Sequence, residues 1–188
     1  MCIRDSYQNI SFIDSYDPEY VIILSGDQIC KQDYADFLRF HKEKGAEFSV
    51  AVMEVDWKEA SRFGLMVADE NDKITEFQEK PPVPKSNLAS MGIYIFNWDV
   101  LKKYLEEDEA DPNSKNDFGM NIIPALLRDG RKMYAYHFNG YWRDVGTIDS
   151  LWEANMEVLD PENSGIDIFD KKWKIYSRNP VLPAQKIG

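Results

Sequence analysis

An aspartate follows the first strongly apolar run of this sequence. Residues 20–24 form a short β-branched block, typical of a strand covered on both faces, and the block stops at a Ser-Gly-Asp sequence that ends at Asp27. Ligands of open α/β sheets collect at the carboxyl ends of strands, so Asp27 offers a carboxylate where chemistry usually occurs. An ordinary turn is the structural alternative, because Asp is common in turns.

A second carboxylate, Asp144, lies after a predicted strand at residues 132–138 and shortly before Thr147, which is placed to cap a helix. Because Asp27 and Asp144 each end a predicted strand, we expect them to face one another across the carboxyl edge of the sheet. Turn formation and helix capping are the structural alternatives for this pair.

The third candidate is the Glu79-Lys80 pair, which ends a predicted hairpin arm and directly precedes two prolines. A lysine is a compact point charge for phosphate, and a carboxylate accepts hydrogen bonds from hydroxyls. Taken alone, the pair is more typical of a solvated hairpin end. Because proline restricts the backbone of the residue before it, we expect the Lys80 side chain to be aimed.

Composition limits the classes of function. With 44% hydrophobic and 13% aromatic residues, the 188-residue chain can bury a core, which excludes general disorder. Its formal net charge of −11 disfavours a nucleic-acid partner, so an anionic substrate must meet local Lys or Arg. No apolar run approaches the roughly 18 to 20 residues of a membrane span, and no secretory signal is visible. We therefore expect a cytoplasmic protein with no membrane partner.

Periodicity predicts the elements that position these residues. Asp33 is placed to cap a helix that stops at Gly45, and a strand at 48–55 completes a βαβ unit, for which a parallel sheet is expected. The rest of the chain is predicted to form six further elements, in this order: a hairpin (65–68 and 74–78), a strand (91–96), a helix (99–107), a short helix (121–127), the strand at 132–138 and a last helix after Thr147.

Six short motifs, taken together in this order and spacing, resemble bacterial glucose-1-phosphate adenylyltransferases, the ADP-glucose pyrophosphorylase family. They are Ser-Gly-Asp27, Arg62-Phe-Gly64, Glu79-Lys-Pro81, Ser90-Met-Gly-Ile-Tyr94, Asp117-Phe-Gly119 and Tyr141-Trp-Arg-Asp-Val-Gly-Thr147. The resemblance implies an α/β fold: a Rossmann-like, GT-A-like nucleotidyltransferase with a mixed sheet and flanking helices, followed by the start of a left-handed β-helix domain.

The resemblance also implies an activity. An adenylyl group passes from ATP to α-D-glucose 1-phosphate, giving ADP-glucose and pyrophosphate for glycogen synthesis. The enzyme would be an allosteric homotetramer or heterotetramer at full length. By the same resemblance Asp27 and Asp144 are the catalytic carboxylates that hold Mg²⁺, which suits a reaction that depends on positioning and charge neutralisation.

The remaining implied residues bind glucose 1-phosphate. Lys80 would bind the phosphate and Glu79 a glucose hydroxyl, while Ser90 and the Gly64 backbone complete the pocket. Tyr94 would stack on the sugar, although an aromatic residue in a strand more often belongs to the core.

Two departures from the family pattern leave alternatives open. Gln28 and Cys30 stand where the family usually has His and Tyr, and the Gly-rich loop that cradles the ATP phosphates is not found in this sequence. The alternatives are a non-catalytic regulatory subunit of the same enzyme and a sugar-1-phosphate nucleotidyltransferase of another nucleotide specificity. We expect the isolated chain to transfer no adenylyl group.

The predicted organisation is that of an internal fragment. Residues 1–6 do not resemble the family and are interpreted as a sequence artefact or scar. Residues 7–160 are predicted to form the nucleotidyltransferase domain without its N-terminal nucleotide-binding part. Residues 161–188 are predicted to form a linker into a truncated C-terminal β-helix domain.

Overall fold

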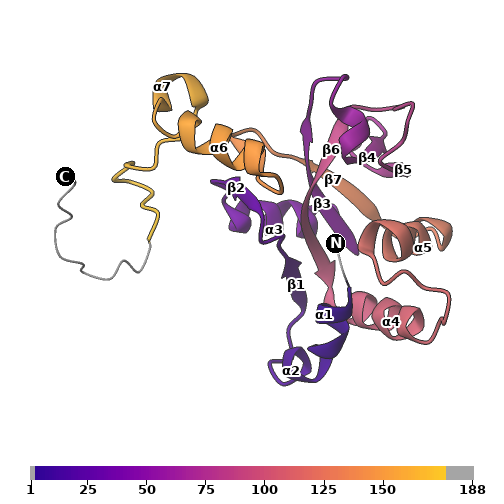
Figure 1. Ribbon diagram of the computed structural model, residues 1–188. Coiled ribbons are helices and arrows are strands. Elements are labelled where there is room, and N and C mark those ends of the chain that lie inside the picture. Colours follow the sequence, from indigo (N-terminus) through magenta and orange to yellow (C-terminus); the bar gives the residue numbers. More distant parts are fainter. Residues whose placement is uncertain (1–2, 177–188) are drawn as a thin grey trace.

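A mixed β-sheet with helices on both faces forms the centre of the protein in a computed structural model, which describes residues 3–176 (Figure 1). The main sheet has the order β5-β4-β6-β3-β7, and β1 pairs with β6 beyond the end of β4. A separate two-stranded ribbon joins β2 to β8. The predicted α/β class with a mixed sheet and flanking helices is thus confirmed.

The strands are β1 (Tyr20–Ile23), β2 (Gln28–Cys30), β3 (Phe48–Glu54), β4 (Gly64–Ala68), β5 (Ile74–Glu79), β6 (Leu88–Asn97), β7 (Met133–His137) and β8 (Trp142–Asp144). The helices are α1 (Arg4–Gln8), α2 (Ile10–Asp14), α3 (Tyr34–Glu43), η1 (Ala60–Arg62), α4 (Trp98–Glu109), η2 (Phe118–Ile122), α5 (Ile123–Arg128), α6 (Ile148–Glu157) and α7 (Pro161–Ser164). The predicted hairpin corresponds to β4 and β5.

The expectation of a parallel sheet from the βαβ unit was wrong in one respect. Strands β1 and β3 do run in the same direction, but β6 lies between them and is antiparallel to both. Only β3 and β7 form a parallel pair in the described part of the chain. Strand β1 pairs with a single neighbour, and Ile22 is 40% exposed, so its apolar run is not covered on both faces as predicted.

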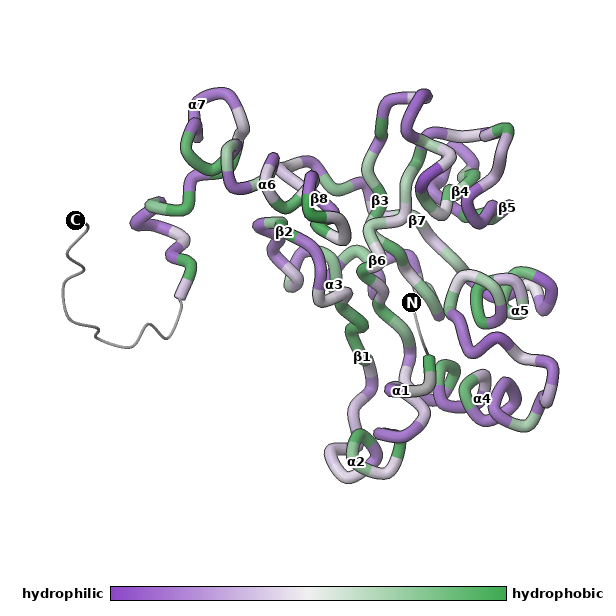
Figure 2. Tube along the Cα trace, viewed as in Figure 1, coloured by the Kyte–Doolittle hydropathy of each residue, from purple (hydrophilic) through white to green (hydrophobic). Residues whose placement is uncertain are grey.

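Two apolar layers hold the sheet to its helices. On one face Phe48, Val50 and Val52 of β3 pack in a cluster with residues of α4, η2 and α5. On the other face Ala51 packs in a cluster with Phe37 of α3. This alternation follows from the two-residue period of a strand, and Figure 2 shows the central strands β1, β3 and β6 mostly toward the hydrophobic end of its colour scale.

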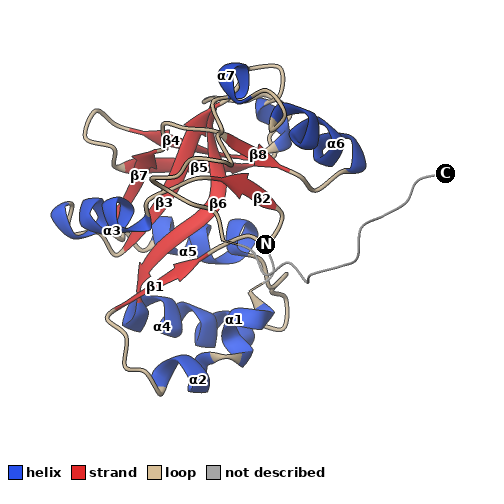
Figure 3. Cartoon of the chain, turned by 90° about the vertical axis from the view of Figure 1, so that its left-hand side faces the viewer, coloured by secondary structure: helices blue, strands red, loops and turns tan. Residues whose placement is uncertain are grey.

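Helix α6 lies beside the β2–β8 ribbon, outside the main sheet (Figures 1 and 3). Thr147 caps it as predicted: its hydroxyl accepts from the backbone N–H of Ser150, and the Ser150 hydroxyl accepts from Thr147. Apolar side chains on this helix and just after it are exposed, with Ile148 at 86% and Leu159 at 73%.

Within residues 3–176, no helix is long and apolar enough to cross a membrane. Residues 161–176 form α7 and turns. The rest of the predicted linker into a β-helix domain, residues 177–188, lies outside the described residues.

Candidate functional site

A cavity of about 180 Å³ opens where β4, β5, β6 and β8 come together, and we call it the central cavity. Six of the seven predicted site residues line it. These are Gly64 of β4, Glu79 of β5, the following Lys80, Ser90 and Tyr94 of β6, and Asp144 of β8. Residues separated widely in sequence therefore meet at one place.

The seventh residue, Asp27, lies beside Asp144. The β2–β8 pairing sets Gln28 opposite Asp144, and the Val145 backbone N–H donates to the Asp27 carbonyl at 2.9 Å. A Cβ atom placed on Gly146 would lie 3.0 Å from Asp144 Oδ1 and 3.6 Å from Asp27 Oδ2. Both carboxylates thus face the space that Gly146 leaves open.

The predicted reason for this meeting was only half right. Asp144 is the last residue of β8, but Asp27 lies in the loop between β1 and β2. The two aspartates are brought together by the separate β2–β8 ribbon, not by neighbouring strands of the main sheet. The Ser25 hydroxyl donates to Asp27 Oδ1, and the Gly146 backbone N–H donates to Asp144 Oδ1 at 2.8 Å, so local hydrogen bonds orient both carboxylates.

Glu79 lies close to a second acidic residue, Asp117. The Asp117 carboxylate caps η2 by accepting from the backbone N–H groups of Gly119 and Met120, at 2.9 and 3.1 Å. A Cβ on Gly119 would approach Glu79 Oε2 to 2.6 Å, so the Glu79 carboxylate would have to shift to admit it. Burial, followed by the negative charge of Asp117, raises the pKa of Glu79. A ligand that donates hydrogen bonds to Glu79 would favour its charged form.

Lys80 adopts an unusual backbone conformation. Its φ of 44° lies in the left-handed region, whereas the following proline predicted an extended backbone. The Lys80 N–H donates to the Phe63 carbonyl at 3.2 Å, which extends the β4–β5 pairing before the chain turns sharply away. This hydrogen bond outweighs the extended preference, and the expectation that the Lys80 side chain is aimed stays a prediction.

A pair of Lys80 variants tests this conformation. The left-handed region costs a non-glycine residue about 1 to 2 kcal/mol, part of which glycine loses again through its greater freedom in the unfolded chain. We expect Lys80→Gly to have a free energy of unfolding about 0.5 to 1 kcal/mol above that of Lys80→Ala, measured by urea denaturation. A Lys80→Ala variant more stable than Lys80→Gly would contradict the conformation described.

Ser90 and Tyr94 form the wall of the cavity along β6. The Tyr94 hydroxyl lies 3.5 Å from Ser90 Oγ, and burial raises the pKa of Tyr94 to about 12. Its ring packs against Phe48 and Phe118, with centroids 5.6 and 5.7 Å apart. Tyr94 is thus a core residue that presents its hydroxyl end to the cavity, and stacking of a sugar on its ring face finds no support.

Other residues line the central cavity and were not predicted as site residues, among them Gln28, Arg62, Asp117 and Trp142. The Trp142 indole N–H donates to Gln28 Oε1 at 3.2 Å, which joins the two strands of the ribbon. Arg62, Asp117 and Trp142 all lie within the motifs quoted above. Membership in those motifs was therefore a sequence signal from which these three residues could have been predicted.

A larger cavity of about 480 Å³, the outer cavity, adjoins the central cavity. Arg62, Phe63, Trp142 and Asp144 line both. The outer cavity extends toward the N-terminus of α6, where Thr147 and Ser150 form part of its lining.

The site combines paired carboxylates, a lysine and a wall that carries hydroxyl groups, on a mixed α/β sheet. The family model described as "Nucleotidyl transferase" matches residues 6–161, and the chain therefore belongs to the nucleotidyl transferase family.

Curated relatives agree with the resemblance seen in the motifs. The chain is 65% identical to the glucose-1-phosphate adenylyltransferase of Clostridium beijerinckii, over 97% of this chain and 47% of the relative. It is 64% identical to that of Clostridium acetobutylicum, over 97% and 48%, and 60% identical to that of Desulforamulus reducens, over 97% and 45%. The chain thus spans about half the length of the curated relatives it matches.

Proposed function

We propose that this chain carries the glucose 1-phosphate side of a glucose-1-phosphate adenylyltransferase. The reaction would transfer an adenylyl group from ATP to α-D-glucose 1-phosphate, giving ADP-glucose and pyrophosphate. The observation that carries this proposal is the convergence of Glu79, Lys80, Ser90 and Asp144 on one cavity. The names of the curated relatives support the same substrates.

Each side chain has a role that suits its chemistry. The Lys80 ammonium would bind the sugar phosphate, and the Glu79 carboxylate would accept from glucose hydroxyls. The Ser90 hydroxyl and the Gly64 backbone would complete the sugar pocket, with the Tyr94 hydroxyl in its wall. These groups would fix the orientation of the sugar phosphate, which is the main requirement of a phosphoryl-type transfer.

The two aspartates fit a divalent cation. Asp27 and Asp144 present carboxylate oxygens to the same space, which a side chain on Gly146 would fill. Mg²⁺ prefers such oxygen ligands and often binds through one or two carboxylates plus substrate phosphates. Bound there, it would offset the charge of the phosphoryl oxygens. We propose these residues as the Mg²⁺ site.

No protein nucleophile is needed in this mechanism. A phosphate oxygen of glucose 1-phosphate attacks the α-phosphorus of ATP, a new P–O bond forms and pyrophosphate leaves. Burial raises the pKa of the Cys30 thiol, which keeps this neighbour of the site in its unreactive protonated form. The chain's own residues would orient the attacking phosphate.

Gln28 keeps a second candidate open. It lines the central cavity, bonded to Trp142, where the family usually has His. A non-catalytic regulatory subunit with the same fold would tolerate this change. An assay of ADP-glucose formation from ATP and glucose 1-phosphate with Mg²⁺ would distinguish an enzyme from such a subunit. The protein assayed should contain this sequence and have the full length of the curated relatives.

We further propose that the full-length protein acts in glycogen synthesis, is under allosteric control and assembles as a tetramer.

Lys80→Ala tests the proposed sugar-phosphate site. We expect the Kd of the 188-residue chain for glucose 1-phosphate, measured by isothermal titration calorimetry, to rise by roughly tenfold to a hundredfold, because a charge-assisted hydrogen bond to phosphate is lost. Lys103→Ala, on the exposed face of α4, is the control and should leave the Kd unchanged. Equal Kd values for both variants would exclude Lys80 from the site.

A further inference from the structure

Arg62 is a second cation at the central cavity. It is the last residue of η1, and it lines both the central and the outer cavity. The hydrogen bond from Lys80 N–H to the Phe63 carbonyl places the Lys80 backbone directly against the segment that carries Arg62. The two cations therefore reach the cavity from adjacent segments.

The negative charge of the cavity means that a bound phosphate would need a second cation besides Lys80. The carboxylates of Glu79 and Asp144 line it together with the cations Lys80 and Arg62. A phosphomonoester adds close to two negative charges at neutral pH. One ammonium cannot balance this excess, whereas a guanidinium adds a charge and a planar pair of donors that match phosphate oxygens.

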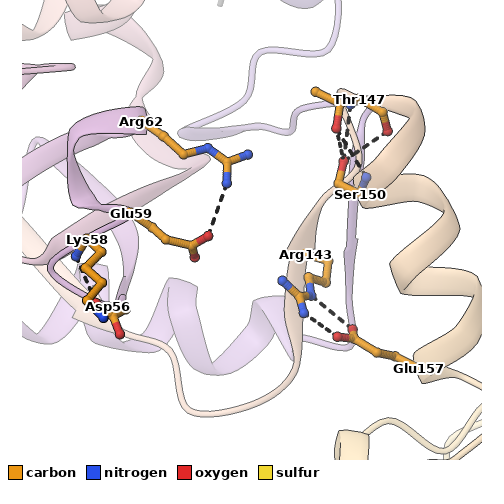
Figure 4. Close-up of polar contacts among 8 residues, drawn as sticks. All are labelled: Asp56, Lys58, Glu59, Arg62, Arg143, Thr147, Ser150 and Glu157. Carbon is orange, nitrogen blue, oxygen red and sulfur yellow. Dashed lines mark hydrogen bonds and ion pairs between the residues drawn. The ribbon is translucent and has the colours of Figure 1, made fainter.

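Arg62 is weakly engaged in the structure. Its Nη1 lies 3.2 Å from Glu59 Oε1, in an i,i+3 pair whose side chains are 59% and 52% exposed. Exposed pairs of this kind contribute at most about 1 kcal/mol, so exchange for a phosphate costs little. Figure 4 shows Arg62 and Glu59 extending into the space that separates their segment from Arg143 and Ser150.

We infer that Arg62 is a second phosphate-binding residue of the central cavity, and that it leaves Glu59 when a phosphate ester binds. Lys80 then supplies a point charge, and Arg62 supplies directional hydrogen bonds from the end of η1, just before β4. The inference rests on the proposed sugar-phosphate site and adds to it a residue that discriminates a phosphorylated sugar from the free sugar.

The test compares matched variants of the 188-residue chain by isothermal titration calorimetry with glucose 1-phosphate and with glucose. Arg62→Ala should raise the Kd for glucose 1-phosphate by about tenfold or more and leave any glucose affinity unchanged. Arg62→Lys should fall between Arg62→Ala and the wild type. Glu59→Gln should lower the Kd severalfold, because the competing carboxylate is gone.

Arg39 and Asp36 form an equivalent exposed i,i+3 pair on α3 and provide the controls Arg39→Ala and Asp36→Asn. If Arg62→Ala matches Arg39→Ala while Lys80→Ala weakens binding, the role of Arg62 is overturned and the sugar-phosphate site stands. If the wild-type chain binds no glucose 1-phosphate, the proposed site fails and this inference fails with it. An equal loss of glucose and glucose 1-phosphate affinity in Arg62→Ala would also overturn phosphate recognition.

Discussion

Asp144→Asn is expected to lower the rate of ADP-glucose formation by about a hundredfold to a thousandfold, in a protein that contains this sequence and has the full length of the curated relatives. The substitution keeps the shape of the side chain but removes one of the two carboxylates that face Gly146. Removing a preorganised electrostatic group at a reacting phosphate typically costs on the order of 10²- to 10³-fold in rate. Initial rates of pyrophosphate release, measured over a range of Mg²⁺ concentrations, check this result.

Metal binding supplies an independent readout for the same pair. Titration of Mn²⁺ into the 188-residue chain, followed by electron paramagnetic resonance, should show weaker binding by about tenfold or more in both Asp27→Asn and Asp144→Asn, because ligand charge sets affinity for a hard cation. Asp99→Asn, in the first turn of α4, is the control. Unchanged Mn²⁺ affinity in both site variants would remove the metal assignment and leave the sugar pocket standing.

The local elements of this fold could be predicted from the sequence. The β4–β5 hairpin, β6, α4 and the capped start of α6 each follow from a short-range signal: alternation, helical spacing, or a Ser or Thr at a cap. The strand order could not be predicted in this way. The insertion of β6 between β1 and β3 depends on pairing between distant residues, which no local periodicity encodes.

The candidate site likewise has features that could be predicted from the sequence and features that could not. Individual residues such as Glu79 and Asp144 stand out in motifs, but their meeting depends on the β2–β8 ribbon, whose strands have three residues each. Strands this short carry almost no alternation signal. The left-handed backbone of Lys80 was also hidden, because the tertiary contact with Phe63 overrides the preference that a following proline imposes.

The short strand β8 is held by helix α6, and Glu157 makes the connection. Arg143 Nε donates to Glu157 Oε2 at 3.0 Å, and Arg143 Nη2 donates to Glu157 Oε1 (Figure 4). The Tyr141 hydroxyl donates to Glu157 Oε2 at 2.6 Å. Along β8, alternate side chains point to opposite sides. Arg143 is therefore turned to α6, while its neighbours Trp142 and Asp144 line the central cavity.

Glu157→Gln is expected to lower the free energy of unfolding by about 2 to 3 kcal/mol at neutral pH, because part-buried, charge-assisted hydrogen bonds to Arg143 and Tyr141 are weakened together. Chemical denaturation followed by tryptophan fluorescence measures the change. Glu153→Gln, four residues earlier on the same helix, is the control and should stay within about 0.5 kcal/mol of the wild type.

The pH dependence of this difference separates the ion pair from a mere change of shape. The pKa of Glu157 is lowered, first by its hydrogen bond with Arg143 and further by that with Tyr141, against the opposing effect of burial. A carboxyl group with a lowered pKa in the folded protein stabilises it fully above its ordinary value of 4.5, and this stabilisation is lost as the pH falls through the folded-state pKa. The unfolding free energies of the wild type and Glu157→Gln should therefore differ most near pH 7 and converge as the pH falls below 4.5. A difference that stays constant down to the lowest pH at which both proteins fold would show that the amide disturbs packing, and that the charge of Glu157 does not hold β8 against α6.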